Sequence, residues 1–214
     1  MPKHTPAATR PRRQTGSPSG VEGPPRLELV REAARTHFAE RGYEAASMRD
    51  IAASAGIRIS TLYFHCTTKE QLLFDVLQDS MVELASGLKA RIEEVGPSWT
   101  ERLAAAIAFH VQYSAERAFG TTVNRTDMNH LSPAHRAEYL AMRDSYEHQF
   151  RDLVRGGIES GELRPVDPKL TVFAIIGTGL TVGRWYRPDG PLTPEEIGRA
   201  YVDLLLHALR PARS

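Results

Sequence analysis

The side chains best suited to chemistry in this sequence form a short polar and basic run that follows Gly56. An arginine can bind guanine with two hydrogen bonds, serine and threonine hydroxyls bind bases or phosphates, and isoleucine can contact a thymine methyl group. Tyrosine, histidine and lysine side chains suit phosphate contacts, which fix register. Residue types of this kind favour DNA recognition. The candidate DNA-contacting residues are Ser47, Arg58, Ile59, Ser60, Thr61, Tyr63, His65 and Lys69.

The sequence contains no recognisable catalytic or metal-binding arrangement. None of the eight histidines belongs to a His-x-x-x-His pair or a Glu-x-x-His motif. His130 and His135 are five residues apart around Ser132-Pro133, so they do not share a helical face. The single cysteine, Cys66, cannot form an internal disulfide and fits a small packed thiol better than a redox sensor. We therefore expect no enzyme activity, no metal and no cofactor.

Composition limits the class of protein further. The chain has 214 residues, is 41% hydrophobic, and carries 27 basic and 26 acidic side chains. This balance excludes a histone-like polycation, and no apolar run approaches the roughly 18 residues of a membrane span. Because no apolar stretch follows the basic residues near the N-terminus, a secretory signal is not expected. The sequence predicts a soluble cytoplasmic protein without a membrane partner.

The first 25 residues differ from the rest of the chain. They contain six prolines and three glycines, with four basic side chains against one acidic side chain. A segment so poor in large apolar residues cannot bury enough surface to offset its ordering entropy. We predict a disordered basic tail over residues 1–25. It fits either a solvated leader or an arm that touches DNA phosphate or the minor groove.

From Arg26 onward, apolar residues recur at helical spacing and helix starts are clearly marked. Ser47, Thr67 and Ser98 each precede an acidic residue by three positions, which is capping-box spacing. Serine, aspartate or threonine precedes a proline at Ser132 and at two later positions, as is common where helices begin. No turn signal joins two alternating β-branched runs. The sequence predicts an all-α protein with about nine helices.

Two of these helices are unusually short. The pattern predicts one helix from Ser47 to Ser54, a break at Ala55-Gly56, and a second helix from Arg58 to His65. Helices of this size are unstable alone, so they must pack on the preceding helix. A glycine-containing turn between two short helices is typical of the helix-turn-helix, whose second helix enters the major groove. Ordinary helical hairpins share this spacing.

A longer string resembles the DNA-binding domain of the TetR/AcrR transcriptional regulators over residues 26 to 73. The segments that carry the resemblance are Phe38-Ala-Glu-Arg-Gly-Tyr43, Arg49-Asp-Ile-Ala-Ala-Ser-Ala-Gly-Ile57, Thr61-Leu-Tyr63 with His65, and Lys69-Glu-Gln-Leu72. The resemblance implies a homodimer that places two recognition helices on a palindromic operator, usually as a repressor. It also implies a ligand-binding and dimerisation domain over residues 74–214, whose occupation by a small molecule releases the DNA.

The C-terminal domain offers candidates for both of these roles. Pockets among helices are the usual ligand sites of such bundles. The candidate ligand-binding residues are Phe109, Tyr113, Met128, Met142, Tyr146, Phe173 and Arg184. Two apolar helices near the C-terminus suit a symmetric four-helix contact between subunits. The candidate dimer-interface residues are Leu180, Trp185, Ile197, Tyr201 and Leu205.

The segment from Gly183 to Thr193, together with Tyr201, resembles a subgroup of this family that controls fatty-acid, acyl-CoA and steroid catabolism. That resemblance implies a small hydrophobic effector such as an acyl-CoA, with Arg184 as a contact for its phosphate or carboxylate. A sensor of drugs or aromatic compounds that controls an efflux operon is the alternative, and a pocket without cations would favour it. A constitutive DNA-binding protein with a purely structural C-terminal bundle is a second alternative.

Overall fold

The computed structural model describes residues 26–117 and 127–211, and the predicted tail over residues 1–25 lies outside them. Within the described residues there are eight α-helices, one 3-10 helix and no strand, so the predicted all-α class is confirmed. The prediction was about nine helices. The elements are α1 (Arg26–Ala45), α2 (Met48–Ser54), α3 (Ile59–His65), α4 (Lys69–Glu93), α5 (Trp99–Glu116), η1 (Asp127–His130), α7 (Pro133–Glu159), α8 (Pro168–Trp185) and α9 (Pro194–Leu209).

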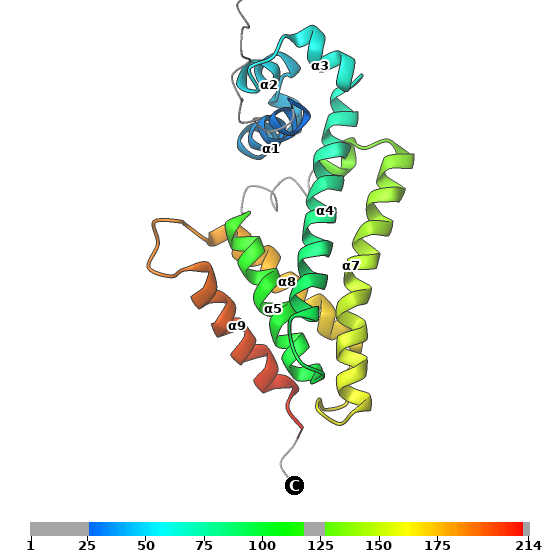
Figure 1. The fold of residues 1–214 in the computed structure, drawn as a ribbon, viewed down its shortest axis with the longest axis vertical. Helices are drawn as coiled ribbons and strands as arrows, with labels where there is room; N and C mark the ends of the chain where they lie inside the picture. The colour runs from blue at the N-terminus through cyan, green and yellow to red at the C-terminus, as the bar shows by residue number, and fades with distance from the viewer. Residues whose placement is uncertain (1–25, 118–126, 212–214) are drawn as a thin grey trace, which may run out of the picture.

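The helices form a small head and a larger body that share α4 (Figure 1). Helices α1 to α3 make the head, and α4 runs from the head along the length of the body. Helix α5 is the centre of the body, because it packs against α4, α7, α8 and α9. Helices α5 and α7 run in opposite directions, so the end of α5 and the start of α7 both lie on the side of the head.

Short polar side chains begin the helices largely as the sequence predicted. The hydroxyls of Ser47, Ser98 and Ser132 each accept a hydrogen bond from the backbone N–H three residues later. The expected cap at Thr67 is wrong, because Thr68 caps α4 by accepting from the Gln71 backbone N–H. The carboxylate three residues after Thr67 instead bonds to the body, as described below.

The head depends on the packing of its short helices. Ile51 of α2 and Leu62 of α3 are completely buried, and Phe38 of α1 lies in the same core. Helix α1 kinks at Gly42 (φ 76°). Gly56, between α2 and α3, also has a positive φ of 68°, a conformation that glycine adopts without strain. Buried apolar residues and one left-handed glycine therefore fix α3 relative to α1.

In the body, α8 crosses α5 at very close range because of one glycine. A Cβ atom at Gly179 would overlap the His110 ring and the Ser114 hydroxyl of α5. Both side chains are buried, so neither can swing away into solvent. Gly177, two residues earlier on α8, faces open space, because a Cβ atom added there would have no described atom within 4 Å.

We predict that Gly179→Ala lowers the free energy of unfolding by about 1–3 kcal/mol, because the added methyl group overpacks the crossing. The matched variant Gly177→Ala should keep or raise this free energy, since alanine favours helix by about 1 kcal/mol over glycine. Chemical denaturation measures the free energy of unfolding of both variants. Sedimentation shows whether either substitution changes the association of subunits and not only the packing within one subunit. Equal destabilisation with unchanged association would contradict the prediction.

At the end of the body farthest from the head, a carboxylate joins the connection between α7 and α8 to the start of α5. Glu162, in the connection between α7 and α8, accepts hydrogen bonds from the Thr100 backbone N–H at 2.9 Å and the Ser98 hydroxyl at 2.7 Å. These bonds lower the pKa of Glu162 to about 2. The negative charge also lies at the N-terminus of α5, where the helix dipole favours it.

This contact makes stability depend on acidity. Because the folded-state pKa is lowered, the ionised Glu162 stabilises the fold above pH ~4.5, and this contribution falls as pH decreases toward 2. We expect Glu162→Gln to lower the melting temperature at neutral pH, with a deficit that shrinks as the pH approaches 2. Glu159→Gln is the matched control on the exposed end of α7 and should show little deficit at either pH. A pH-independent deficit for Glu162→Gln would refute the ionic origin.

Candidate DNA interface and internal cavity

Helix α3 presents a free outer face on the head. Arg58 is the residue that precedes its first turn, and Arg58 and Ser60 are exposed. Thr61 is half-buried. Ile59 and Tyr63 are 38% and 49% exposed, which is unusual for large apolar and aromatic side chains. The structure thus brings the residues predicted to read bases together on one exposed surface.

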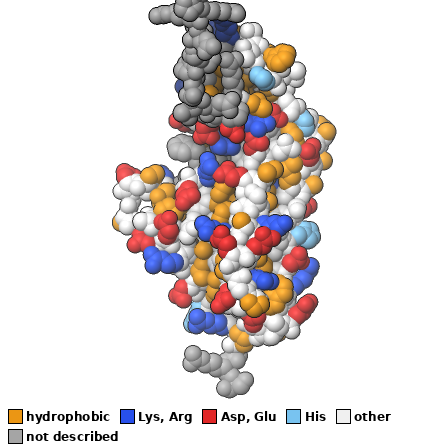
Figure 2. Space-filling view, in the orientation of Figure 1, with side chains coloured by type: hydrophobic (Ala, Val, Ile, Leu, Met, Phe, Trp, Pro, Cys, Tyr) orange, Lys and Arg blue, Asp and Glu red, His pale blue; other side chains and the backbone are white. Residues whose placement is uncertain are grey.

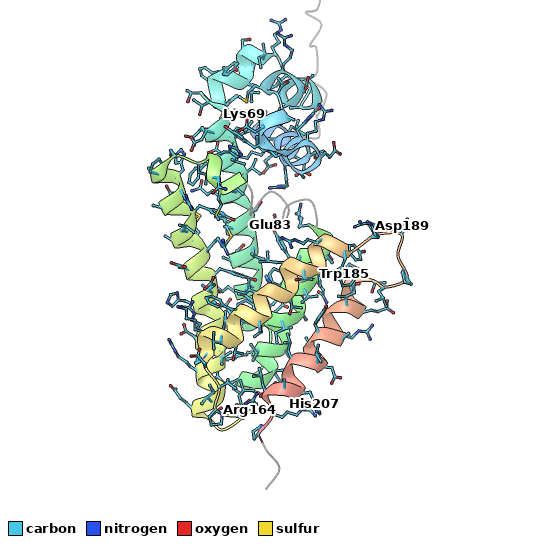
Figure 3. The ribbon with its side chains drawn as sticks, turned by 180° about the vertical axis from the view of Figure 1, so that it is seen from behind. Lys69, Glu83, Arg164, Trp185, Asp189 and His207 are labelled. Carbon is cyan, nitrogen blue, oxygen red and sulfur yellow. The ribbon has the colours of Figure 1, made fainter. Side chains whose placement is uncertain are left out.

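Two other residues predicted to contact DNA also make contacts within the subunit. Ser47 caps α2 by accepting from the Asp50 backbone N–H at 3.1 Å. The Lys69 amine donates to the Glu44 carbonyl at 3.1 Å and lies 4.4 Å from the centre of the Tyr43 ring. Figure 3 shows Lys69 at the junction of head and body. Lys69 therefore joins the end of α1 to the start of α4.

Two exposed residues of the head were missed by the sequence prediction. Phe64 of α3 is 86% exposed, and its one ring contact is with His65, itself a predicted DNA contact. Arg49 of α2 is exposed and forms no ion pair or hydrogen bond within the described part of the chain. Helical spacing alone does not show which exposed side chains of the head meet a partner.

Cys66 follows α3 and is packed in the core. It is 1% exposed, and its thiol donates to the Thr68 carbonyl with a sulfur–oxygen distance of 3.0 Å. Burial, followed by the charge of Asp75, raises the pKa of the thiol to about 11. A protonated, buried thiol fits the packing role that the sequence favoured.

The junction also links α4 to the start of α7. One carboxylate oxygen of Glu70 lies 2.8 Å from the Ser132 backbone N and 2.8 Å from His135 Nδ1. The His135 ring stacks on Phe74 with 4.1 Å between ring centres. His130 of η1 stacks in turn on Tyr43 of the head, at 4.5 Å. Ring stacking and a shared carboxylate therefore hold the head against the first turns of α7.

An internal cavity of about 320 Å³ lies between α4, α5, α7 and α8. This volume is near the lower end of the roughly 300–1,000 Å³ found for small-molecule sites. The head also takes part, because Arg35 of α1 lines the cavity. Apolar side chains from α4, η1 and α8 form much of the wall: Met81, Leu84, Met128, Ile176 and Leu180.

Three arginines line the same cavity. Arg35 pairs with Glu32 at 2.7 Å, and Arg117 pairs with Glu83. Arg143 forms no ion pair within the described residues, and its nearest polar contact is a methionine sulfur at 4.0 Å. The Nε atom of Arg35 is buried without a hydrogen-bond partner in the same described part. The wall therefore offers unused hydrogen-bond donors and an uncompensated positive charge.

The structure places only part of the predicted ligand-binding set at this cavity. Tyr113, Met128 and Tyr146 line it, whereas Phe109, Met142, Phe173 and Arg184 do not. Arg184 and Phe173 are exposed on α8. Sequence reasoning missed Arg143, because its neighbours on α7 alternate in charge like those of a solvated helix face.

The predicted dimer residues are also distributed over different environments. Leu180 lines the cavity, and Ile197 is 3% exposed within the subunit. Tyr201 and Leu205 are half-buried, and Trp185 is 44% exposed at the end of α8 (Figure 3). The large apolar side chains left exposed on α8 and α9 are Leu170, Phe173, Trp185 and Leu204. Elsewhere acidic and basic side chains are interspersed over the visible face of the body (Figure 2).

Both parts of the chain match known sequence families. Residues 30–76 match the bacterial regulatory proteins of the tetR family, and residues 96–209 match the tetracyclin repressor-like C-terminal domain. The HTH-type transcriptional repressor KstR2 of Mycolicibacterium smegmatis is 31% identical over 183 residues, covering 85% of this chain and 88% of that protein. KstR2 of Mycobacterium tuberculosis is 31% identical over 186 residues, covering 85% and 90%.

Solved structures share the fold. The ketosteroid transcriptional regulator KstR2 of Mycobacterium tuberculosis has a TM-score of 0.79 and 26% identity, covering 89% of this chain and 97% of that chain. AibR, solved in complex with isovaleryl coenzyme A and operator DNA, has a TM-score of 0.77 and 28% identity, covering 85% and 98%. No helix in the described residues is long and apolar enough to cross a membrane.

The exposed arginines Arg58, at the start of α3, and Arg49, on α2, lead us to predict two different effects of losing an arginine. Arg58→Ala should relax selectivity at one base position by about 1–3 kcal/mol, because a bidentate base contact is lost. Arg49→Ala should weaken binding to all sequences and reduce the slope of log affinity against log salt by about 1, because a phosphate contact is lost. Binding titrations against a selected operator and its single-base variants measure both effects.

Lys89→Ala is the control, since Lys89 lies near the far end of α4 and is exposed. It should change neither selectivity nor salt dependence. An Arg58→Ala variant with intact base preference would remove Arg58 from base recognition.

Proposed function

The chain belongs to the TetR family of DNA-binding transcriptional regulators, and from that premise we propose that it is a homodimeric repressor released from its operator by an anionic amphipathic ligand such as an acyl-CoA. The family and the relatives are transcriptional regulators and not enzymes. The observation that carries the proposal is the cavity between α4, α5, α7 and α8, with an apolar wall and three arginines.

The charges of the cavity support an anionic ligand. Among the described residues Glu147 is the one acid in the cavity wall, and it is already paired with Arg151 at 2.7 Å. Arg143 has no carboxylate partner among the described residues, so a ligand carboxylate or phosphate would supply one. Charge-assisted hydrogen bonds of this kind are roughly twice as strong as neutral ones. A cationic drug would instead bring a like charge next to three arginines, which disfavours the multidrug alternative.

The size of the cavity supports a small apolar body. A volume of about 320 Å³ suits a short acyl chain or a compact ring system, with a larger nucleotide group lying outside. Two of the similar structures agree with this chemistry in different ways. AibR was solved with isovaleryl coenzyme A, and KstR2 is described as a ketosteroid regulator.

The position of the cavity supports a coupling between ligand and DNA. Arg35 belongs to α1 of the head, while Met81 and Leu84 belong to α4. An anion that binds Arg35 competes with Glu32, the carboxylate that pairs with Arg35. Glu32 lies on the same head helix, four residues before Thr36. Arg31 of α1 also pairs with Asp79 of α4 at 3.1 Å, one residue before the cavity wall begins. A ligand in the cavity would therefore contact both α1 of the head and α4, the two helices that this ion pair joins.

The homodimer is proposed from the surface that the subunit leaves uncovered. Four large apolar side chains on α8 and α9 are 44% to 66% exposed, with Leu170 and Leu204 the most exposed. Apolar side chains gathered on neighbouring helices mark association surfaces more often than scattered ones do. A two-fold contact through these helices would bring two copies of α3 to bear on one palindromic operator.

We expect isovaleryl-CoA or a longer acyl-CoA to release the purified protein from operator DNA, whereas free coenzyme A does so weakly because it lacks the apolar body. Arg143→Gln should raise the acyl-CoA concentration needed for half-release about tenfold or more, through loss of a charge-assisted hydrogen bond. Fluorescence anisotropy of labelled operator measures this concentration directly.

Arg184→Gln provides the matched comparison, because Arg184 is exposed on α8 and outside the cavity. It should leave half-release unchanged. Release by planar cationic drugs and not by acyl-CoAs would support the multidrug alternative, and release by neither would support the constitutive one. A loss at Arg184 but not at Arg143 would move the anion site out of this cavity.

A further inference from the structure

The end of the cavity away from the head carries a small buried polar group. Tyr146 of α7 and His110 and Ser114 of α5 line this end, and all three are at most 4% exposed. His110 Nδ1 lies 2.9 Å from the Tyr146 hydroxyl oxygen, and its Nε2 lies 3.2 Å from the Ile176 carbonyl oxygen. We call His110, Ser114 and Tyr146 the far-end triad. Nothing in the DNA-binding function uses these groups.

The protons of the far-end triad can be assigned from its partners. A carbonyl oxygen only accepts, so His110 Nε2 must carry a hydrogen and donate it to Ile176. Burial lowers the pKa of His110 to about 4, so the ring is neutral at physiological pH. Nδ1 therefore has a lone pair, and the Tyr146 hydroxyl donates to it. The opposite tautomer would place the Nε2 lone pair against a carbonyl, which opposes a switch.

The Ser114 hydroxyl has also committed its proton. It donates to the His110 carbonyl at 2.7 Å, one helical turn earlier on α5. The hydroxyl oxygens of Tyr146 and Ser114 are thus left with lone pairs only. Tyr113, the residue before Ser114 on α5, follows the same rule, since its two near neighbours, the Ser80 carbonyl and the Glu83 carboxylate, are both acceptors. Hydroxyls that usually serve in both roles act here as acceptors.

The two ends of the cavity therefore have opposite hydrogen-bonding character. On α5, Arg117 lies three residues beyond Ser114 toward the head, and on the antiparallel α7, Arg143 lies three residues from Tyr146. At 1.5 Å per residue, the arginines lie about one to two turns, or roughly 5–10 Å, from the far-end triad. Donors surround the head-side end and acceptors the far end, with apolar wall between them.

We propose that this cavity selects ligands that carry a hydroxyl group on the apolar body, about 5–10 Å from the anionic group, over the corresponding ketones. The hydroxyl donates to Tyr146 or Ser114, whereas a ketone oxygen would face lone pairs and lose its hydrogen bond to water. The inference rests on the proposed function, because the anionic end must bind at the arginines to position the hydroxyl. It adds a specificity that the apolar wall does not supply.

The test uses matched pairs of short carboxylic acids that carry either a secondary alcohol or a ketone on the penultimate carbon, over a series of chain lengths, because their carboxylate lies within this distance of the alcohol, whereas the phosphates of a CoA thioester do not. Direct binding is measured by calorimetry with the full-length protein. At the best chain length we expect the alcohol to bind about tenfold or more tightly than the ketone, as for loss of a hydrogen bond in a buried site. Equal affinities, or a preference for the ketone, would overturn the inference while leaving the proposed function intact.

If neither member of any pair binds, but the unsubstituted acids do, the far end excludes polar groups and the inference is also wrong. If neither the acids nor any acyl-CoA binds, the proposed function fails, and the inference fails with it. The three failures are therefore distinguishable from binding data on unmodified protein alone.

Variants then locate the acceptor. Tyr146→Phe and Ser114→Ala each remove one hydroxyl oxygen, and at least one of them should reduce the alcohol preference toward equality. Ser114→Ala preserves the His110–Tyr146 bond, so it tests the idea even if Tyr146→Phe does not fold. Tyr201→Phe is the matched control on α9, away from the cavity lining, and should keep the full preference. Full preference in both folded far-end variants would contradict the assignment.

Discussion

Helix α4 carries one continuous hydrophobic core from the head into the body, and the rest of the structure depends on this sharing. Its first turns, with Leu72 and Leu73 fully buried, complete the packing of α1 to α3, and Leu88 is fully buried in the body. Helices α2 and α3 have seven residues each and cannot be stable without that support. A shift of α4 in the body must therefore move or loosen the helix that faces DNA, because close-packed cores do not deform continuously.

The cavity lies where such a shift can be produced. Its wall takes residues from both the head and the body. Neighbouring carboxylates neutralise the charge of only some of its arginines. A buried donor without a partner costs free energy, so the buried Nε atom of Arg35 favours binding of an anion that accepts its hydrogen bond. A ligand can change an equilibrium only by its differential affinity for two states. In the proposed function, contact with α1 and α4 together would give the ligand that differential affinity.

Local features of the sequence predicted most of the fold and the surface of α3. Caps such as Ser98 and Asp167 act within one helical turn, so their residue types mark helix starts directly. The cap predicted at Thr67 was wrong because the adjacent threonine caps the helix instead, and the carboxylate of Glu70 bonds to the body. The choice between Arg143 and Arg184 could not be made from spacing, because it depends on which helix faces lie toward the cavity. Likewise, Gly177 and Gly179 cannot be told apart by residue type, and only packing shows that α8 approaches α5 at Gly179.

Helix α8 links ligand selection to the proposed dimer in the way that α4 links the cavity to the head. Its inner face supplies the Ile176 carbonyl that fixes the His110 tautomer, and Gly179, which admits that ring. Its outer face exposes Phe173 and Trp185. Because both faces belong to one rigid helix, a partner subunit that holds α8 in place also holds the carbonyl in place. The acceptor character of the far-end triad is then a property of the assembled dimer as much as of the cavity.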